Sequence, residues 1–279
     1  MVNAFERQAA LDPRAAGARR FAGKVCIVTG AGQGIGRATA RRFAAEGGLV
    51  VVAERAEEPA RETVRQLTEA GAEAVADICD VSRFEEAERL MQQTMDRFGR
   101  INVLANVVGG TIWWQRYHEY AVEQIMLELE RSLNTALWCC KAVLPHMVAQ
   151  KSGSIINFGS SVTHGGLYRV PYAVSKGGIE ALTQTLAAEY GPDSIRVNGV
   201  SPGTTIIPDR TTSRLTLRPG EIAAAMQGTE ARVEEARSLQ TSVLGRHSTP
   251  DEQAAVVAFL ASDDASYVTG QMISCHGAP

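Results

Sequence analysis

Near its start the chain reads Lys24-Val-Cys-Ile-Val-Thr29-Gly30-Ala-Gly-Gln33-Gly34-Ile35-Gly36. Residues 24–29 have the length and β-branched content of a strand that is buried on both faces. The glycines follow at once, and a helix-forming stretch continues to residue 46. A strand, a glycine turn and a helix in this order present the free N–H groups of a helix N-terminus to an anion. The stretch therefore predicts the first unit of a dinucleotide-binding fold.

Each spaced glycine has its own expected role in such a unit. Gly30 permits the tight turn, Gly34 lets the backbone approach a pyrophosphate, and Gly36 allows the helix to pack closely on the strand. A loop that merely needs glycine is the alternative interpretation. The residues expected to hold the cofactor here are Gly30, Gln33, Gly34, Ile35 and Gly36.

The second apolar run, residues 49–53, ends at Glu54. A carboxylate after the second strand of a nucleotide-binding unit hydrogen-bonds the adenosine ribose hydroxyls. Because it would repel a 2′-phosphate, Glu54 predicts NAD rather than NADP. Arg55 leaves the alternative open, since a guanidinium can hold that phosphate, and either residue could be a solvated turn charge.

Helix-like and strand-like segments alternate along the rest of the chain. Helices are expected at 59–70, 84–98, 121–150 (partly broken near Ser132), 171–190 and 251–262, and strands at 74–79, 101–105, 153–158, 195–200 and 271–274. This alternation predicts one α/β domain over 21–279, a Rossmann-like doubly wound parallel sheet flanked by helices, with ligands at the carboxyl ends of the strands. The residues at those ends are Asp80, Val81, Asn106, Ser160, Pro202 and Gly203, each of which could also be a cap or turn former.

The composition is that of an ordinary globular protein. The chain has 279 residues, 45% of them hydrophobic, and a formal net charge of -3. This balance gives no basic footprint for nucleic acid, and no apolar run reaches membrane-spanning length. Residues 1–20 mix arginine with acids and are expected to form a flexible extension rather than an export signal. Residues 204–246 form a long irregular segment that could fold over a substrate.

The five cysteines favour neither a disulfide framework nor a metal site. Their number is odd, none forms a C-x-x-C pair, and no histidine cluster accompanies them. Free thiols inside apolar runs behave as small hydrophobes. The pattern therefore predicts no metal and a reducing cytoplasm.

Tyr172 and Lys176 form the candidate catalytic pair. They are four residues apart, so a helix places them on one face. A phenol with a pKa near 10 becomes a base at neutral pH only if a cation stabilises the phenolate, and a lysine can supply that charge. A serine at the preceding strand end could hold the substrate oxygen. Taken alone, such a pair is more often a surface face of a helix.

Taken in order, these motifs closely resemble the short-chain dehydrogenase/reductase family over residues 21–277. They are Thr29-Gly30-(x3)-Gly34-x-Gly36, Asn106, a strand-end serine, Tyr172-x-x-x-Lys176 and Pro202-Gly203. The resemblance implies that Tyr172 is the acid/base, that Lys176 lowers its pKa and binds the nicotinamide ribose, and that the serine orients the substrate. It also implies adenine contact at Asp80 and a homotetramer.

Three departures from the family pattern concern the site. Where the family usually has a second asparagine after Asn106, this chain has Val107. Where the family has the helix asparagine that anchors a relay water, this chain has Ser132, and Asn134 follows two residues later. A side chain two positions further along a helix points in a different direction, so Ser132 is preferred over Asn134 as the replacement for the relay asparagine. Either Ser160 or Ser161 could orient the substrate, and strand alignment favours Ser160.

Finer stretches are similar to one subgroup, the dehydrogenases of carboxylated cis-dihydrodiols. They are Val108-Gly-Gly-Thr-Ile-Trp113, Arg131-Ser-Leu, Thr135-Ala-Leu-Trp-Cys-Cys and Arg169-Val-Pro-Tyr172. A small-molecule diol with a carboxylate needs a cation, and a bidentate arginine suits it. The expected substrate contacts are Arg169 first, then Arg210 and Arg214, together with Ser161, while Trp113 and His164 are expected to be walls of the pocket.

Three alternatives remain open at this stage. The first is a dehydrogenase for another ring-carboxylate diol that keeps its carboxylate. The second is a general NADPH-dependent ketone or β-ketoacyl reductase. The third is a catalytically silent nucleotide-binding protein, because fold alone does not fix function.

Overall fold

Seven parallel strands form the single sheet of the computed structural model, which describes residues 19–207 and 242–277. Their order is β3-β2-β1-β4-β5-β6-β7, so the chain reverses direction across the sheet between β1 and β4. The strands are β1 (Val25–Thr29), β2 (Leu49–Glu54), β3 (Ala74–Ile78), β4 (Val103–Asn106), β5 (Gly153–Phe158), β6 (Ile195–Pro202) and β7 (Met272–Cys275). In a doubly wound sheet, ligands bind at such a reversal point, outside the carboxyl ends of the strands.

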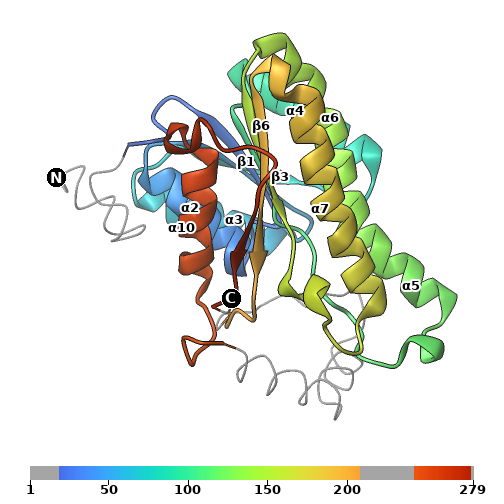
Figure 1. Ribbon diagram of the computed structural model, residues 1–279. Coiled ribbons are helices and arrows are strands. Elements are labelled where there is room, and N and C mark those ends of the chain that lie inside the picture. The colour runs from blue at the N-terminus through green and yellow to red at the C-terminus, as the bar shows by residue number, and fades with distance from the viewer. Residues whose placement is uncertain (1–18, 208–241, 278–279) are drawn as a thin grey trace.

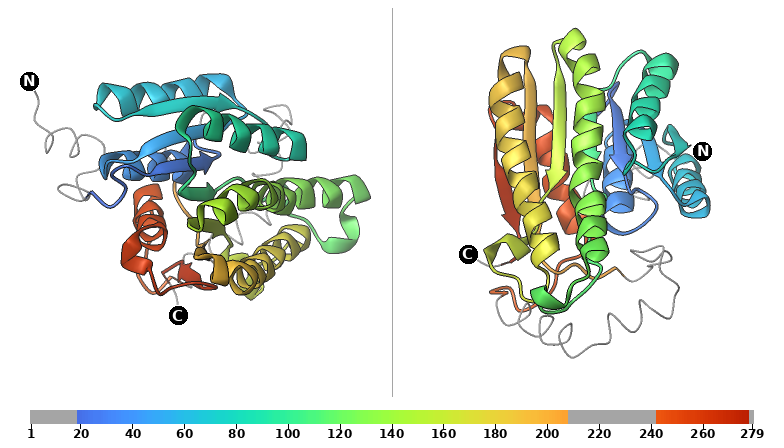
Figure 2. Two further views of the ribbon diagram at one scale, coloured as in Figure 1. Left: turned by 90° about the horizontal axis from the view of Figure 1, so that it is seen from above. Right: turned by 90° about the vertical axis from the view of Figure 1, so that its right-hand side faces the viewer.

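Helices cover both faces of this sheet (Figures 1 and 2). One layer contains α2 (Gly34–Ala45), α3 (Glu57–Glu69) and α10 (Pro250–Ala261). The other contains α4 (Phe84–Phe98), α6 (Thr135–Gln150) and α7 (Val170–Tyr190), while α5 (Val122–Leu129) extends beyond the sheet. The predicted fold class is confirmed. The boundaries differ by a few residues: α3 begins at Glu57 instead of residue 59, and β4 begins at Val103 instead of residue 101.

The strand side chains alternate between two hydrophobic cores, one under each helix layer. On β1, Cys26 and Val28 belong to the core beneath α2 and α10, and Val25 and Ile27 to the core beneath α4 and α6. All five residues of β1 are buried, as expected for a strand covered on both faces. The five cysteines are free thiols, and four of them are buried in these cores.

The long helix expected over 121–150 is divided at Ser132, where the sequence indicated a break. A π-helical turn, Glu130–Asn134, separates α5 from α6. Such a turn adds a residue to the helix and redirects side chains, and it frequently occurs at functional sites. Ser132 is buried within it. Helix α7 packs against the turn, because a Cβ on Gly178 would lie 3.0 Å from Leu133 Cδ1.

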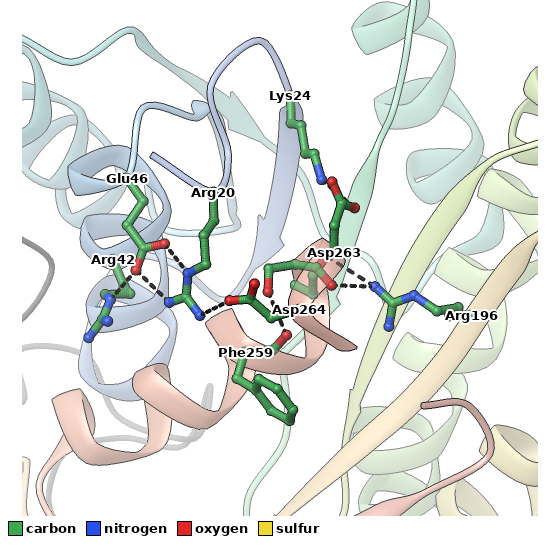
Figure 3. A network of polar contacts seen from close by, with 10 residues as sticks. Arg20, Lys24, Arg42, Glu46, Arg196, Phe259, Asp263 and Asp264 are labelled. Atoms are coloured by element: carbon green, nitrogen blue, oxygen red, sulfur yellow. Dashed lines mark hydrogen bonds and ion pairs between the residues drawn. The ribbon is translucent and has the colours of Figure 1, made fainter. Parts of the chain in front are cut away.

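A partly buried ionic network joins the start of the described chain to the end of α2 and to the short 3-10 turn, Asp263–Ala265, that follows α10 (Figure 3). The Glu46 carboxylate is fully buried and accepts hydrogen bonds of 2.6 Å from both Arg20 and Arg42. Arg20 also contacts Asp264, 3.2 Å away. Arg196 donates to the carbonyls at the end of α10, where a cation complements the helix dipole. The network fixes the rear of the sheet, away from the strand ends that carry the candidate site.

Two further findings concern the described ranges only. Within residues 19–207 and 242–277, no helix combines the length and apolar character needed to cross a membrane. In the same ranges, no group of three or more histidine, cysteine or acidic side chains is placed to hold a metal ion.

Candidate active site

The glycine turn between β1 and α2 has the geometry that its sequence predicted. Gly30 and Gly34 have φ angles of 64° and 54°, a region that favours glycine. A Cβ on Gly36 would overlap the carbonyl oxygen of Gly30, so only glycine allows the helix to start this close to the strand. Gln33 precedes the first turn of α2 and Ile35 lies within it. These residues form a cradle that fits the pyrophosphate of a dinucleotide.

Glu54 ends β2 with its carboxylate against the glycine turn. Its Oε2 accepts a hydrogen bond of 3.2 Å from Gly32 N, and its Oε1 accepts from the backbone of Arg55 and Ala56 at 3.0 Å and 3.2 Å. A Cβ on Gly32 would lie only 2.9 Å from Oε2. The negative charge is therefore fixed beside the loop that would carry the adenosine half of the cofactor.

The other predicted cofactor residues lie at the ends of neighbouring strands. Asp80 is exposed and its Oδ1 accepts from Ser82 N at 3.0 Å, while Val81 is buried. Asn106 donates to Asn157 Oδ1 at 2.9 Å, which joins β4 to β5. Asp80 and Val81 therefore follow the carboxyl end of β3, and Asn106 ends β4; their contacts with a cofactor stay a prediction.

Pro202 and Gly203 complete this edge at the end of β6. The Gly203 N–H donates to Cys275 O on β7 at 3.3 Å. A Cβ on Gly203 would lie 2.7 Å from the His276 Cβ, so glycine is needed for the C-terminal residues to pass this close. The backbone of β6 therefore continues into the site without a side chain in the way.

The structure brings Tyr172 and Lys176 together on the first turns of α7. Lys176 Nζ lies 5.7 Å from the Tyr172 ring centroid. The lysine is 3% exposed, and its ammonium donates a hydrogen bond of 2.6 Å to Phe158 O at the end of β5. Burial lowers the pKa of Lys176 to about 8, and the charge of Glu128 opposes that decrease. A cation held beside a phenol is the arrangement that stabilises a phenolate.

The segment after β4 closes over this pair. A Cβ on Gly109 would lie 3.1 Å from Lys176 Nζ and 3.7 Å from Ser132 Oγ. Ser132 Oγ also accepts from Gly110 N at 3.4 Å. The predicted position Ser132 thus lies next to the lysine, on the redirected turn between α5 and α6.

Both candidate serines follow β5. Ser160 Oγ accepts a hydrogen bond of 3.2 Å from Val162 N and caps a short 3-10 turn, and Ser161 begins that turn. Both side chains are half-buried. The preference for Ser160 stays a prediction.

Trp113 and the start of α7 are joined by Tyr120, which the sequence did not single out. The Tyr120 hydroxyl lies 2.8 Å from Trp113 O and 3.0 Å from Tyr168 O, so its single proton is shared between the two carbonyls. Tyr168 has a φ of 61°, which a residue with a side chain rarely adopts. The wall that contains Trp113 is therefore anchored to the segment that leads into Tyr172.

Arg169 immediately precedes α7, on the same side of the site as Trp113. Its Nη2 would lie 2.9 Å from a Cβ on Gly166, so the guanidinium folds over that glycine. Burial, and then the charge of Glu128, raise the pKa of Tyr120, and the charge of Arg169 opposes that increase. Arg169 is thus directed toward the interior of this region.

No contact with Tyr172 or Lys176 is described for the remaining predicted substrate residues. His164 is exposed, and its ring centroid is 5.9 Å from that of His276. Burial and the proximity of His164 lower the pKa of His276. Arg210 and Arg214 lie outside the described residues.

Glu128 is the main site residue that the sequence reasoning missed. It is fully buried on α5, and its Oε1 accepts from Ile112 N at 2.6 Å and from Trp113 N at 3.3 Å. One signal was available: Glu128 is four residues before Ser132, the spacing that puts two helix side chains on one face. A carboxylate on the same face as a predicted catalytic position is a site candidate.

Comparisons with known proteins agree with this geometry. Residues 30–277 match the protein family described as enoyl-(acyl carrier protein) reductase. The chain is 41% identical to 1,6-dihydroxycyclohexa-2,4-diene-1-carboxylate dehydrogenases of Acinetobacter baylyi and of Pseudomonas putida. The alignment with the Acinetobacter protein covers 93% of this chain and 97% of that protein. The alignment with the Pseudomonas protein covers 90% of this chain and 91% of that protein.

A solved structure supports the same assignment. A crystal structure of NAD+-bound xylitol dehydrogenase superposes with a TM-score of 0.81 at 31% identity, covering 91% of this chain and 98% of that one. The glycine cradle, the buried lysine beside Tyr172 and the parallel sheet are the features that carry the family resemblance in this chain. The protein therefore belongs to the short-chain dehydrogenase/reductase family and is an oxidoreductase that acts on a CH–OH donor with a nicotinamide dinucleotide.

Proposed function

We propose that the protein oxidises 1,6-dihydroxycyclohexa-2,4-diene-1-carboxylate to catechol, with NAD as the hydride acceptor and with loss of CO2. The observation that carries this substrate is the 41% identity, over nine-tenths of the chain, to two dehydrogenases of that name. The buried Lys176 beside Tyr172 supports the chemistry. Such a reaction belongs to the degradation of aromatic acids such as benzoate.

Tyr172, as phenolate, takes the hydroxyl proton of the secondary alcohol, and Lys176 stabilises the phenolate. Ser160 orients the substrate oxygen, and Ser132 takes the place of the relay asparagine. The bound nicotinamide supplies the acceptor for the hydride that leaves the same carbon. The new ketone is β to the substrate carboxylate. When the carbon–carboxylate bond breaks, its electron pair enters the ketone as an enolate, CO2 leaves, and protonation of the enolate gives catechol.

Aromatisation makes this loss of CO2 strongly downhill, so the proposal needs no separate decarboxylating side chain. A sister enzyme for a cumate-type diol would oxidise the alcohol and keep the carboxylate. The identity of the product therefore separates the two functions, whereas the rate of NADH formation does not.

We further propose that Arg169 binds the substrate carboxylate. Replacing it by methionine (Arg169→Met) removes a charge-assisted contact, so kcat/KM for the carboxylated diol should fall about 30-fold. The matched control is cis-1,2-dihydroxycyclohexa-3,5-diene, which lacks the carboxylate; the two enzymes should oxidise it equally well. Initial rates of nicotinamide absorbance give both values. An equal loss on the two diols would contradict a carboxylate contact.

The preference for NAD is proposed from Glu54, whose carboxylate is fixed against Gly32. Replacing it by serine (Glu54→Ser) removes the charge that would repel a 2′-phosphate and leaves Arg55 beside it. We expect kcat/KM with NADP to rise at least about tenfold, and that with NAD to fall, because one ribose contact is lost. A wild-type enzyme that already prefers NADP would overturn this assignment.

A homotetramer is proposed from the apolar faces of two helices. Val122 and Met126 on α5 are 67% and 58% exposed, and Val174 on α7 is 58% exposed. Exposed apolar groups at helical spacing favour association. Light scattering of the purified protein decides the state, and a monomer would refute it. The free thiols support the proposal of a cytoplasmic location.

The division of the chain is also proposed. Of the extension predicted over residues 1–20, residues 1–18 lie outside the described residues, whereas Arg20 is held by Glu46 and Asp264. Residues 21–279 would form the catalytic domain. Residues 204–246, most of which lie outside the described ranges, would form the substrate loop.

A further inference from the structure

We propose that Glu128 is a positioning residue of the active site, whose buried carboxylate fixes the segment 109–113 against Lys176 and Ser132. The inference rests on the proposed function only for its preferred substrate. The segment and the lysine belong to the alcohol and nicotinamide site of any oxidation that this enzyme performs.

The contacts along the segment show how it is held. Glu128 Oε1 accepts hydrogen bonds from Ile112 N at 2.6 Å and Trp113 N at 3.3 Å. Four residues later, Ser132 Oγ accepts from Gly110 N at 3.4 Å. Two side chains, one on α5 and one on the π-helical turn, therefore hold three backbone N–H groups of this segment. At the near end of the segment, Gly109 lies directly over Lys176 Nζ.

The second connection runs from Glu128 to the catalytic helix. Its carbonyl oxygen lies 3.4 Å from Ser175 Oγ, in the residue before Lys176, and shares the single hydroxyl proton with Pro171 O, which is closer at 2.9 Å. The side chain is fully buried, and its charge raises the pKa of Lys176 against the effect of burial. The Tyr172 ring on α7 lies beside the Lys176 ammonium, and the charge of Glu128 on α5 also acts on it.

A buried carboxylate is an expensive way to hold a loop. Placing a charge in a protein interior costs several kcal/mol unless it is compensated, and a neutral side chain could accept the same two N–H groups. The two backbone N–H groups compensate part of this cost, and the same carboxylate acts on Lys176, because its charge raises the pKa of that lysine. Two consequences follow: the carboxyl group sets the position of Trp113 in the substrate wall, and its charge supports the ammonium of Lys176.

Two substitutions separate these consequences. Glu128→Gln keeps an oxygen that can accept from Ile112 and Trp113 but removes the charge. We expect kcat to fall about tenfold, because Lys176 loses a negative charge that favours its ammonium form, with KM for the alcohol nearly unchanged. Glu128→Ala also releases the segment, so kcat should fall and KM for the alcohol should rise about tenfold.

The matched control is Glu123→Gln, which removes an exposed carboxylate from the first turn of the same helix and should leave kcat and KM at wild-type values. Circular dichroism and thermal melting confirm that each variant is folded. If Glu128→Gln keeps wild-type kcat and KM while only its melting temperature falls, Glu128 is structural and the proposal is wrong. If Glu128→Ala does not fold, Glu128→Gln alone decides.

This outcome is distinct from failure of the proposed function. A wild-type enzyme that ignores the carboxylated diol but oxidises another alcohol would refute the proposed substrate. The same variants, compared on that other alcohol, would still test the role of Glu128.

Discussion

Replacing Tyr172 by phenylalanine (Tyr172→Phe) is expected to lower kcat for diol oxidation about 10³-fold, the middle of the range for general acid–base catalysis. The substitution removes only the hydroxyl, so the ring keeps its place 5.7 Å from Lys176 Nζ. No other group in the described part of the site combines a titrating hydroxyl with a buried ammonium beside it. The loss should therefore appear in kcat and not in cofactor affinity.

Cofactor binding supplies the control for this variant. Quenching of tryptophan fluorescence by NAD should give the same Kd for wild type and Tyr172→Phe, because the glycine cradle and Glu54 are unchanged. A variant that keeps both its affinity and its full turnover would show that another group removes the proton.

Lys176 has the second large expected effect. Replacing it by methionine (Lys176→Met) keeps the length of the aliphatic part of the side chain but removes the ammonium that donates to Phe158 O. We expect kcat to fall about 10²-fold, because the phenolate loses its stabilising charge, and KM for NAD to rise. Steady-state kinetics with varied NAD separates the two effects.

The wild-type pH profile tests the same group. Burial lowers the pKa of Lys176 to about 8, so the side chain is an ammonium below that pH and loses its charge above it. Turnover should therefore decline above about pH 8. A phenolate at Tyr172 favours the ammonium, so it moves this decline to higher pH and never to lower pH. The turnover of Lys176→Met should not decline in this way. If the variant shows the same decline as the wild type, the decline belongs to the titration of another group.

The local patterns in the sequence predicted most of the fold and the cofactor cradle. Gly36 is an example: its missing Cβ is required by a contact with Gly30, only six residues away, so the spacing alone indicated it. The buried strands were equally clear, because residues such as those of β1 are apolar on both faces. Such signals are contained within one strand–turn–helix unit.

The substrate side could not be predicted in the same way, since its contacts join distant segments. Glu128 holds a loop that precedes it by fifteen residues or more, and Tyr120, which contacts Trp113, also contacts Tyr168, 48 residues further along the chain. A glutamate in a helix does not reveal from sequence whether it faces water or the interior. The π-helical turn was anticipated only as a break near Ser132, because propensities do not distinguish a π turn from a kink.

The most direct test of the account is the stoichiometry of wild-type turnover. The enzyme is mixed with NAD and with diol that carries ¹³C in its carboxyl group, and NADH, catechol and ¹³CO2 are quantified together. The account predicts equal amounts of all three. NADH accompanied by a product that retains the labelled carboxylate, or no NADH from this diol at all, would contradict it.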